Sequence, residues 1–320
     1  MLYLPIFNYL SMDNAELPEG QTVSFRSGFV NIIGRPNAGK STLMNALVGE
    51  RMSIITHKPQ TTRHRIIGIL TGETFQLVFS DTPGYVHDPS YKMHQAMNRF
   101  VESTKEDADL LLLVFDLTEE LEDANPILSM LAGSDAPILL VLNKTDLVQP
   151  QRVEDSYNWW RKRLKIADYV AISALKSEHT STLLEKILAY IPEGPAYYPT
   201  DQLTDRPERF FVSEIIREKI FLRYSDEVPY SCEVGIDSFQ ESTTTKGEAI
   251  ARIRATIFVI RESQKGILLG KNGSAIKNLG IAARLAIEEF LQTKVHLELT
   301  VKVRDNWRDD DRALQQFGYE

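Results

Sequence analysis

Two features that are scarce or absent in this 320-residue chain limit the kinds of protein that it can be. It has a single cysteine, Cys232, so no disulfide can form within the chain, as is usual in a reducing compartment. It has no apolar run of the roughly 18 residues that span a bilayer; the best candidate, Leu110 to Phe115, lies between Asp109 and Asp116. We therefore expect a cytoplasmic protein without a transmembrane segment, and we leave open a peripheral association with the inner membrane.

We also expect no secretory signal, and the sequence contains no tandem repeats. Its apolar start, MLYLPIFNYL, has no basic beginning and no small-residue cleavage site, so we expect residues 1–24 to be an N-terminal extension without an assigned role. A chain of this length exceeds what one hydrophobic core usually supports, so it should contain two domains.

Positive charge is scarce in the first part of the chain. Residues 1–200 contain 18 Lys and Arg against 24 Asp and Glu, a net charge of 18 − 24 = −6, whereas residues 206–304 contain 16 against 13, a net charge of 16 − 13 = +3. The first part gives no reason to expect a polyanion as its partner. The second part is basic enough to bind nucleic acid, although it is not a strong electrostatic attractor.

Short apolar runs alternate with helical stretches from Phe29 to about Tyr190. Six of these runs are candidate strands: FVNII, IIGIL, FQLVFS, LLLLVF, PILLVL and YVAIS. The segments between them are long enough for crossover helices. The pattern predicts an α/β domain with a doubly wound, mostly parallel sheet over residues 25–191.

A proline-rich linker at residues 192–206 ends this pattern, because its prolines break helices. Residues 207–304 then predict a smaller α+β domain. Its expected elements are a helix to about Leu222, the strands YSCEVGIDSF and IARIRATIFVI, a turn, a helix to about Leu291 and the strand KVHLELTVKV. Residues 305–320 form a C-terminal segment.

The sequence GRPNAGKST, between a candidate strand and a helix, matches the phosphate-binding pattern GxxxxGK[ST]. By chance such a match occurs in only about 1% of chains this long. In this pattern glycines let backbone N–H groups point inward, the lysine reaches the outer phosphates, and the serine hydroxyl is a ligand of Mg²⁺. The predicted phosphate-binding residues are Gly34, Arg35, Pro36, Asn37, Ala38, Gly39, Lys40, Ser41 and Thr42.

A second motif, DTPG, ends the strand FQLVFS and supplies Asp81, Thr82, Pro83 and Gly84. Asp81 can hold the Mg²⁺ shell through a water molecule, and the Gly84 N–H can sense a γ-phosphate. Taken alone, the tetrapeptide would be interpreted as a plain turn. Downstream of the first motif, we interpret it as part of the same site.

The tetrapeptide NKTD, at the end of the strand PILLVL, indicates which base is bound. A carboxylate at Asp146 accepts two hydrogens from the N1–H and 2-amino groups of guanine, which adenine lacks, and such readout can reject the analogue by roughly 10⁴-fold or more. We therefore predict GTP and GDP, which argues against a P-loop kinase or a metabolic ATPase. A helix-capping loop is the alternative, but it does not explain the spacing from the first motif. The predicted base-binding residues are Asn143, Lys144, Asp146, Ser173 and Ala174, whose N–H can reach guanine O6.

Four motifs in this order, GRPNAGKST, DTPG, NKTD and the SAL at Ser173 to Leu175, resemble those of the translation-factor-related small GTPases. The segment PQTTRHR is similar to their switch I, in which the threonine matching Thr62 completes the Mg²⁺ shell; Thr61 is the open alternative. Tyr85 stands where Ras-type enzymes have the glutamine that orients the attacking water. Asn37 resembles the P-loop asparagine of GTPases that use K⁺ in place of an arginine finger, or else it only stabilises the loop.

The resemblance implies a slow, Mg²⁺-dependent GTPase. We predict Lys40, Thr62, Gly84 and Asn37 as its catalytic residues and Ser41, Thr62 and Asp81 as its metal ligands.

A second glycine pair occurs in GKNGS, residues 270–274. It is weak evidence alone, because with 17 glycines in 320 residues about one GxxG pair is expected by chance and a helix cap would explain it. The surrounding elements, however, run α-β-β-α-α-β, which resembles a type II KH domain, whose GxxG loop clamps about four nucleotides. The resemblance implies RNA contacts at Gly270, Lys271, Asn272, Gly273, Ser274 and Lys277.

Residues near this loop have two interpretations. One helix-spaced apolar face is approximated by Ile267, Ile276, Leu279, Ala283 and Ile287. Most of Ile267, Ile276 and Leu279 should be core, and one of them could line a groove for bases. Arg252, Arg254 and Arg261, in the region of the second strand of this domain, are either a solvated face or RNA ligands; Lys277 and Arg284, on the helix after the loop, are better candidates for RNA contact.

The combination of QTTR, the proline-rich linker, the KH order and the C-terminal NWRDDD resembles the Era family of ribosome-assembly GTPases over residues 25–320. The resemblance implies that the partners are the single-stranded 3′ region of small-subunit (16S) ribosomal RNA and the 30S subunit. Because two ligand-binding modules share a short linker, we also expect GTP and Mg²⁺ to control RNA binding. The alternatives are an RNA-binding scaffold with a largely vestigial GTPase and a GTPase that assists RNA modification.

Overall fold

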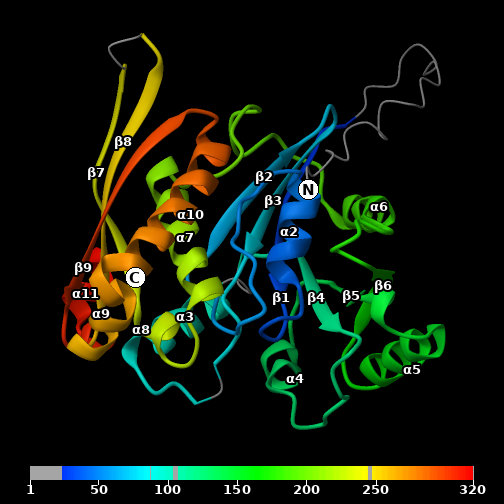
Figure 1. Ribbon diagram of the computed structural model, residues 1–320. Coiled ribbons are helices and arrows are strands. Elements are labelled where there is room, and N and C mark those ends of the chain that lie inside the picture. Colours follow the sequence, from blue (N-terminus) through cyan, green and yellow to red (C-terminus); the bar gives the residue numbers. More distant parts are fainter. Residues whose placement is uncertain (1–23, 87, 104–106, 244–246, 320) are drawn as a thin grey trace. The chain divides into compact units, whose positions relative to one another are not determined.

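The structure, a computed structural model, describes residues 24–86, 88–103, 107–243 and 247–319 (Figure 1). The expected N-terminal extension thus lies outside the described residues, except for Ser24. The chain divides into two compact units. Two short segments, Ile54–Thr61 and Pro89–Ala96, belong to the second unit together with the residues from Arg206 onward.

A six-stranded sheet in the order β2-β3-β1-β4-β5-β6 forms the centre of the first unit. Its neighbouring strands are parallel except for β2 and β3, which pair antiparallel at one edge. The mostly parallel α/β fold predicted from the sequence is confirmed. The strands are β1 Arg26–Ile33, β2 Ile66–Thr71, β3 Phe75–Asp81, β4 Leu110–Asp116, β5 Ile138–Asn143 and β6 Ile166–Ile172.

Helices connect these strands. They are α2 Lys40–Val48, α3 Lys92–Ser103, α4 Pro126–Leu131, α5 Pro150–Arg161 and α6 Thr180–Tyr190, with the short 3₁₀ helix η1 Thr145–Leu147. Across the part of the chain that the structure describes, no helix is long and apolar enough to cross a membrane.

Continuous apolar strands hold the sheet together. Every residue of β4 and β5 is buried, as expected for central parallel strands covered on both faces. The fully buried Trp160 of α5 packs edge-on against Phe115, with ring centroids 5.5 Å apart. Because the strands are parallel, their carboxyl ends lie along one edge of the sheet, and the loops after β1, β3, β5 and β6 carry the predicted nucleotide motifs.

The second unit contains a three-stranded sheet in the order β7-β8-β9, with β7 antiparallel to β8 and β8 parallel to β9. Helices α7, α9 and α10 share one apolar core with the strands (Figure 1). The predicted order is confirmed, with the short α8 added before β7. The elements are α7 Glu208–Arg223, α8 Val228–Ser231, β7 Glu233–Thr243, β8 Ala249–Val259, α9 Glu262–Leu269, η2 Lys271–Gly273, α10 Ser274–Leu291, β9 Lys294–Val303, η3 Trp307–Asp309 and α11 Asp311–Gln316.

One residue predicted for the apolar face is not part of the core. Leu279 and Ile287 of α10 are fully buried and Ile276 packs against the core, but Ile267 of α9 is 49% exposed. The reason is Gly270, whose backbone (φ 68°, ψ 178°) ends α9. A helical face cannot continue through such a conformation, so the periodicity is interrupted and Ile267 lies at the surface.

The C-terminal segment is part of the interior of the second unit. Trp307 is fully buried, and its indole Nε1 donates to the backbone oxygen of Ser231 at 3.0 Å. The hydroxyl of the buried Tyr319 donates to Glu233 Oε2 at 2.6 Å, and the rings of Trp307 and Phe317 meet edge-on. Trp307 and Tyr319 are therefore tied to the end of α8 and to the start of β7.

Candidate functional site

The first glycine loop runs from the end of β1 to the start of α2, and close contacts fix its glycines. A Cβ on Gly34 would lie 2.4 Å from the backbone oxygen of Val114, and one on Gly39 would lie 2.3 Å from Asn143 Nδ2. Gly39 (φ 92°) and Asn37 (φ 65°) have left-handed backbone conformations. Alternation of this kind turns backbone N–H groups toward one side, which is the arrangement that binds anions.

Lys40, the first residue of α2, is a buried cation held by the loop itself. Its ammonium donates to the backbone oxygens of Gly34 and Arg35, both at 2.9 Å. Burial lowers the pKa of Lys40 to about 8, with the carboxylates of Asp81 and Glu119 acting in the opposite direction. The two backbone oxygens carry no net charge, so a bound phosphate would supply the negative charge that balances the Lys40 ammonium.

Nucleotide binding is expected to take up a proton at pH 8. The pKa of Lys40 is about 8 in the free protein, and an anionic ligand would raise it again. Lys40 is already charged well below pH 8, so affinity is flat there; above pH 8 it falls by up to about tenfold per pH unit until the pKa of the complex is reached. Calorimetric titration with GDP at pH 8, in two buffers of different ionisation enthalpy, measures this uptake. Identical binding enthalpies in both buffers would contradict it.

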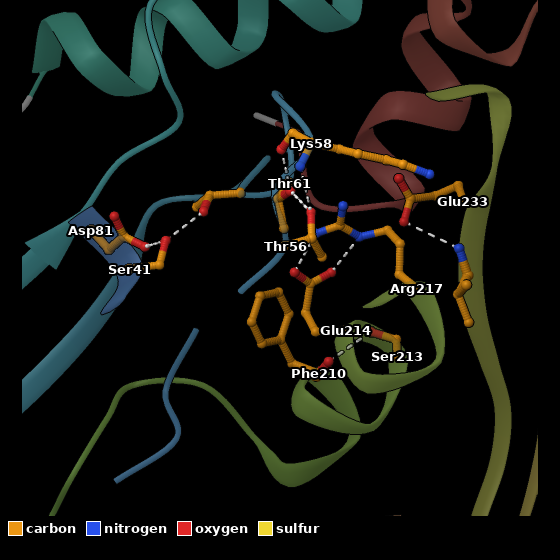
Figure 2. Close-up of polar contacts among 12 residues, drawn as sticks. Ser41, Thr56, Lys58, Thr61, Asp81, Phe210, Ser213, Glu214, Arg217 and Glu233 are labelled. Atoms are coloured by element: carbon orange, nitrogen blue, oxygen red, sulfur yellow. Dashed lines mark hydrogen bonds and ion pairs between the residues drawn. The ribbon is translucent and has the colours of Figure 1, made fainter. Parts of the chain in front are cut away.

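Oxygen atoms from three segments meet beside this lysine. The Ser41 hydroxyl donates to Asp81 Oδ2 at 2.7 Å (Figure 2) and lies 2.9 Å from Thr62 Oγ1. Burial raises the pKa of Asp81, while the Lys40 ammonium and the Ser41 hydroxyl act in the opposite direction. Asp81 Oδ1 is buried without a hydrogen-bond partner among the described residues. Such a set of hard oxygens, one of them unpaired, fits Mg²⁺.

The two threonines of switch I make different contacts. Thr62 Oγ1 lies beside Ser41, as described above. Thr61 Oγ1 lies 2.6 Å from Thr56 Oγ1 and donates to the backbone oxygen of Lys58 at 2.7 Å (Figure 2). The geometry therefore favours Thr62 over Thr61 as a ligand of a metal held at Ser41.

The DTPG motif is brought against the first glycine loop. A Cβ on Gly84 would lie 2.6 Å from Pro36 Cγ, so glycine is required there. The Thr82 hydroxyl donates to the backbone oxygen of Ile32 at 3.0 Å, and Pro83 is buried. Asp81 and Gly84 therefore border the same loop from one side.

Asn143, the last residue of β5, joins the loops of the predicted base site. Its Nδ2 donates to the backbone oxygen of Ala38 at 2.9 Å, and its Oδ1 accepts from the backbone N–H groups of Lys144 at 2.8 Å and Ala174 at 3.0 Å. The structure thus brings together the glycine loop, NKTD and the residues after β6, including the buried Ser173. Asp146 follows in η1, where it is half-buried.

Sequence reasoning missed Asp116, the last residue of β4. Its carboxylate is buried, binds the Lys144 ammonium, and accepts from the backbone N–H and hydroxyl of Thr118 at 2.8 and 2.7 Å. Asp116 thus fixes the lysine of NKTD. A charged residue at the carboxyl end of the otherwise apolar LLLLVFD was a usable signal, because that edge of the sheet carries the site.

Two segments of the second unit are neighbours of the nucleotide motifs in the sequence: residues 54–61 come directly before Thr62, and residues 89–96 follow the DTPG motif. In the first, the Lys58 ammonium donates to the backbone oxygens of Phe221, at 2.6 Å, and Tyr224, at the carboxyl end of α7. A cation is favourable at that end of a helix. In the second, the Lys92 ammonium pairs with Asp311 at 2.6 Å, while its backbone N–H donates to Asp309.

The second glycine loop joins α9 to α10. Gly270 (φ 68°), Asn272 (φ 54°) and Gly273 (φ 75°) all have positive φ, and α10 begins directly after them, so the N–H groups at the start of α10 open onto the loop. Lys271, Asn272 and Ser274 are exposed, as is Lys277 one turn into α10. The loop presents cations, amide groups and a helix N-terminus together, and these are groups that bind phosphate.

Comparison with known protein families gives two matches. A family model described as 50S ribosome-binding GTPase matches residues 29–144, and a KH domain model matches residues 227–308. GTPase Era of Syntrophus aciditrophicus is 44% identical over 301 residues, which cover 94% of this chain and 97% of that protein. GTPase ERA1, chloroplastic, of Zea mays is 44% identical over 310 residues, which cover 96% of this chain and 74% of that protein.

Solved structures are similar over nearly the same length. Era in complex with MgGDPNP and nucleotides 1506–1542 of 16S ribosomal RNA has a TM-score of 0.86 at 34% identity, covering 92% of this chain and 99% of that one. A variant of Aquifex aeolicus Era bound to GDP and AlF₄⁻ has the same TM-score at 33% identity.

The fold and the site together define a P-loop GTPase joined to a C-terminal KH domain. The chain belongs to the Era family of GTPases. The predictions of a GTPase and of a KH domain are confirmed.

Proposed function

We propose that this GTPase is a Mg²⁺-dependent switch that binds the single-stranded 3′ region of 16S ribosomal RNA in the cytoplasm and acts in assembly of the 30S subunit. The meeting of Ser41, Thr62 and Asp81 beside the buried Lys40 carries the nucleotide part of the proposal. The exposed GxxG loop supports the RNA part, and the structural neighbour that was solved with nucleotides 1506–1542 of 16S ribosomal RNA points to the ligand.

In this proposal GTP and GDP bind along the carboxyl edge of the sheet. The glycine loop and Lys40 hold the phosphates, while Asp146 and Lys144 hold guanine. The Ala174 N–H, predicted to reach guanine O6, donates to Asn143 Oδ1, so it contacts guanine only if it shares or releases that hydrogen bond. A bound Mg²⁺ would neutralise charge on the outer phosphates. Asn143 ties the phosphate and base loops together, so both parts of the nucleotide meet a single preorganised surface.

Hydrolysis would be slow, because Tyr85 follows Gly84 where a glutamine would orient water. Thr62 and the Gly84 N–H are the groups that we propose to respond to the γ-phosphate, and Asn37 is the residue that we propose to confer dependence on K⁺. Comparing GTP turnover in KCl and in NaCl tests the role of Asn37. Peripheral association with the inner membrane stays a prediction.

Coupling between nucleotide and RNA would follow from chain connectivity. Residues 54–61 end directly before Thr62, and within the second unit Lys58 holds the end of α7. A nucleotide that orders Thr62 would thereby bias a segment that packs in the KH-containing unit.

RNA affinity is expected to differ between the GDP form and the form with a non-hydrolysable GTP analogue. Fluorescence anisotropy with a labelled fragment of nucleotides 1506–1542 measures it, and equal affinities would exclude the switch. Lys58→Ala removes only the contact with α7, so it should change the ratio of the two affinities while leaving nucleotide affinity within about twofold. Lys162→Ala, at an exposed site on α5's end, is the matched control and should leave the ratio unchanged.

A scaffold with a vestigial nucleotide site is the second candidate, favoured by the absence of a glutamine at Tyr85. Lys40→Ala distinguishes the two. Losing one partner of a buried charge pair costs about 2–5 kcal/mol, roughly 30- to 4,000-fold in affinity. Measurable GTP turnover that disappears in this variant excludes the scaffold, whereas wild-type protein without turnover would support it.

A further inference from the structure

The face of the β7-β8-β9 sheet opposite the helices is not explained by the GxxG loop. Alternation along β9 places Val295 and Val301 in the core, whereas Lys294, His296 and Glu298 are exposed on the other face. On β8 the same alternation buries alternate residues and exposes Arg252 and Arg254. We call this second surface the outer sheet face and define it by Ser238, Gln240, Arg252, Arg254, His296 and Glu298.

The strand register arranges these residues in two rows across the sheet. Gln240, Arg252 and His296 are directly paired, and so are Ser238, Arg254 and Glu298. The two arginines are two residues apart on one strand, which separates their Cα atoms by about 6.6–6.8 Å along it. Together the rows line a shallow hollow of ≈ 190 Å³.

Each of the two guanidinium groups forms one hydrogen bond within the described part of the chain, through its Nε atom. Arg254 Nε donates to the Ser238 hydroxyl at 3.0 Å, and Arg252 Nε donates to the Ser242 hydroxyl at 3.3 Å. Neither arginine forms an ion pair with any residue that the structure describes, although Glu298 is opposite Arg254 in register. The paired Nη groups of each arginine are therefore available for a ligand, and a serine limits the rotation of the side chain.

We propose that the outer sheet face is a second RNA site, which holds the sugar-phosphate backbone of a segment outside the GxxG loop. A planar guanidinium with two free N–H groups matches the geometry of a phosphate. Two of them in line along β8 would bind successive phosphates of one strand. His296, at the edge of the hollow, offers an imidazole that can stack on a base or donate to a phosphate.

The chemistry of the face favours RNA over a protein partner. Six residues that line the hollow are polar or charged, and the seventh, Ile253, is buried in the core. The hollow therefore offers no exposed aromatic or aliphatic residue of the kind that anchors the centre of a stable protein interface. The sequence of this domain, residues 206–304, has a net charge of +3. The identity of the ligand as RNA rests on the proposed function, whereas the location of the second site rests on Arg252 and Arg254.

The test compares two RNA probes, a long one of nucleotides 1506–1542 of 16S ribosomal RNA and a short one of its last ten or so nucleotides. The double variant Arg252→Gln with Arg254→Gln should bind the long probe about 10- to 100-fold more weakly. Because two phosphate contacts are removed, the slope of log affinity against log salt should fall by about 1.4–1.8. Affinity for the short probe, which occupies only the GxxG loop, should be unchanged.

Two further variants keep the outcome interpretable. Lys162→Gln with Lys165→Gln removes the same charge from exposed sites in the first unit and should leave both probes unaffected. Arg254→Lys keeps the charge but not the two-pronged geometry, and it should produce an intermediate loss on the long probe. Thermal unfolding of each variant confirms that the sheet is intact.

The possible failures are distinct. If wild-type protein binds neither probe, the proposed function fails. If it binds both, and the Arg252 and Arg254 double variant binds the long probe with wild-type affinity and salt slope, the second site is overturned and the face is left to a protein partner.

Discussion

The Asp146→Asn variant is expected to lose about 10³- to 10⁴-fold in affinity for GTP and GDP and to gain affinity for xanthosine nucleotides. The Asp146 carboxylate can accept two hydrogens from guanine, whereas an amide directs its NH₂ group at the 2-amino group of guanine, so two donors oppose each other. Xanthine carries a carbonyl oxygen at that position, which accepts from the amide. Competition of GDP and XDP against a fluorescent nucleotide measures both affinities.

The xanthosine arm also serves as the folding control, because a protein that binds XDP tightly has an intact phosphate site. Retention of GDP affinity within about tenfold would show that Asp146 does not read the base. A loss of affinity for both nucleotides, with an unchanged unfolding temperature, would place the role of Asp146 in loop structure instead.

Lys271→Asp combined with Asn272→Asp should abolish RNA binding while leaving the GTPase intact. The exposed loop would present two carboxylates, in place of one cation and one amide, to the RNA phosphate that we propose it binds. Asn272 has φ 54°, a conformation that aspartate also tolerates, so the backbone should keep its shape. Repulsion of like charges at a clamp costs several kcal/mol, so affinity for the short probe of the 16S 3′ end should fall by at least about 100-fold.

GTP turnover without RNA should stay within about twofold in this variant, since none of the nucleotide motifs changes. A matched control is Lys265→Asp with Glu262→Lys, which exchanges an exposed ion pair on α9 at constant net charge. RNA affinity that survives in the aspartate variant would move the RNA site away from the GxxG loop.

The nucleotide motifs could be predicted because each is a contiguous string placed directly after a strand. A parallel sheet brings the carboxyl ends of its strands to one edge, so the strings GRPNAGKST, DTPG and NKTD suffice to predict that they meet. Asp116 was missed because its role depends on a contact across the fold, with Lys144, rather than on a local pattern.

Other features of the site and of the fold do not follow from the sequence alone. The sequence could not separate Thr61 from Thr62, because adjacent hydroxyls differ only in the direction of the backbone. Helical periodicity placed Ile267 on the apolar face. The structure shows that Gly270 ends α9, so residues before and after it do not share one helical face. The contact of Lys58 with the end of α7 joins residues 163 positions apart in sequence, a separation at which no sequence pattern is informative.

The arrangement of Arg252 and Arg254 could be predicted only in part. Their exposure was predictable from strand alternation, but their alignment with each other and with His296 depends on register, which the sequence does not specify. A pair of solvated arginines and a phosphate-binding row have the same sequence pattern.

The burial of Trp307 and Tyr319 has a practical consequence for handling the protein. A label attached next to Tyr319 would lie beside a hydroxyl that is bonded to Glu233 inside the KH-containing unit. Such a label is expected to compete with that packing, and a variant that lacks the buried Trp307 should be less stable. The chain also contains Trp159 and Trp160, so the fluorescence of Trp307 is obtained as the difference between the wild-type protein and Trp307→Phe, and it indicates whether this packing is in place.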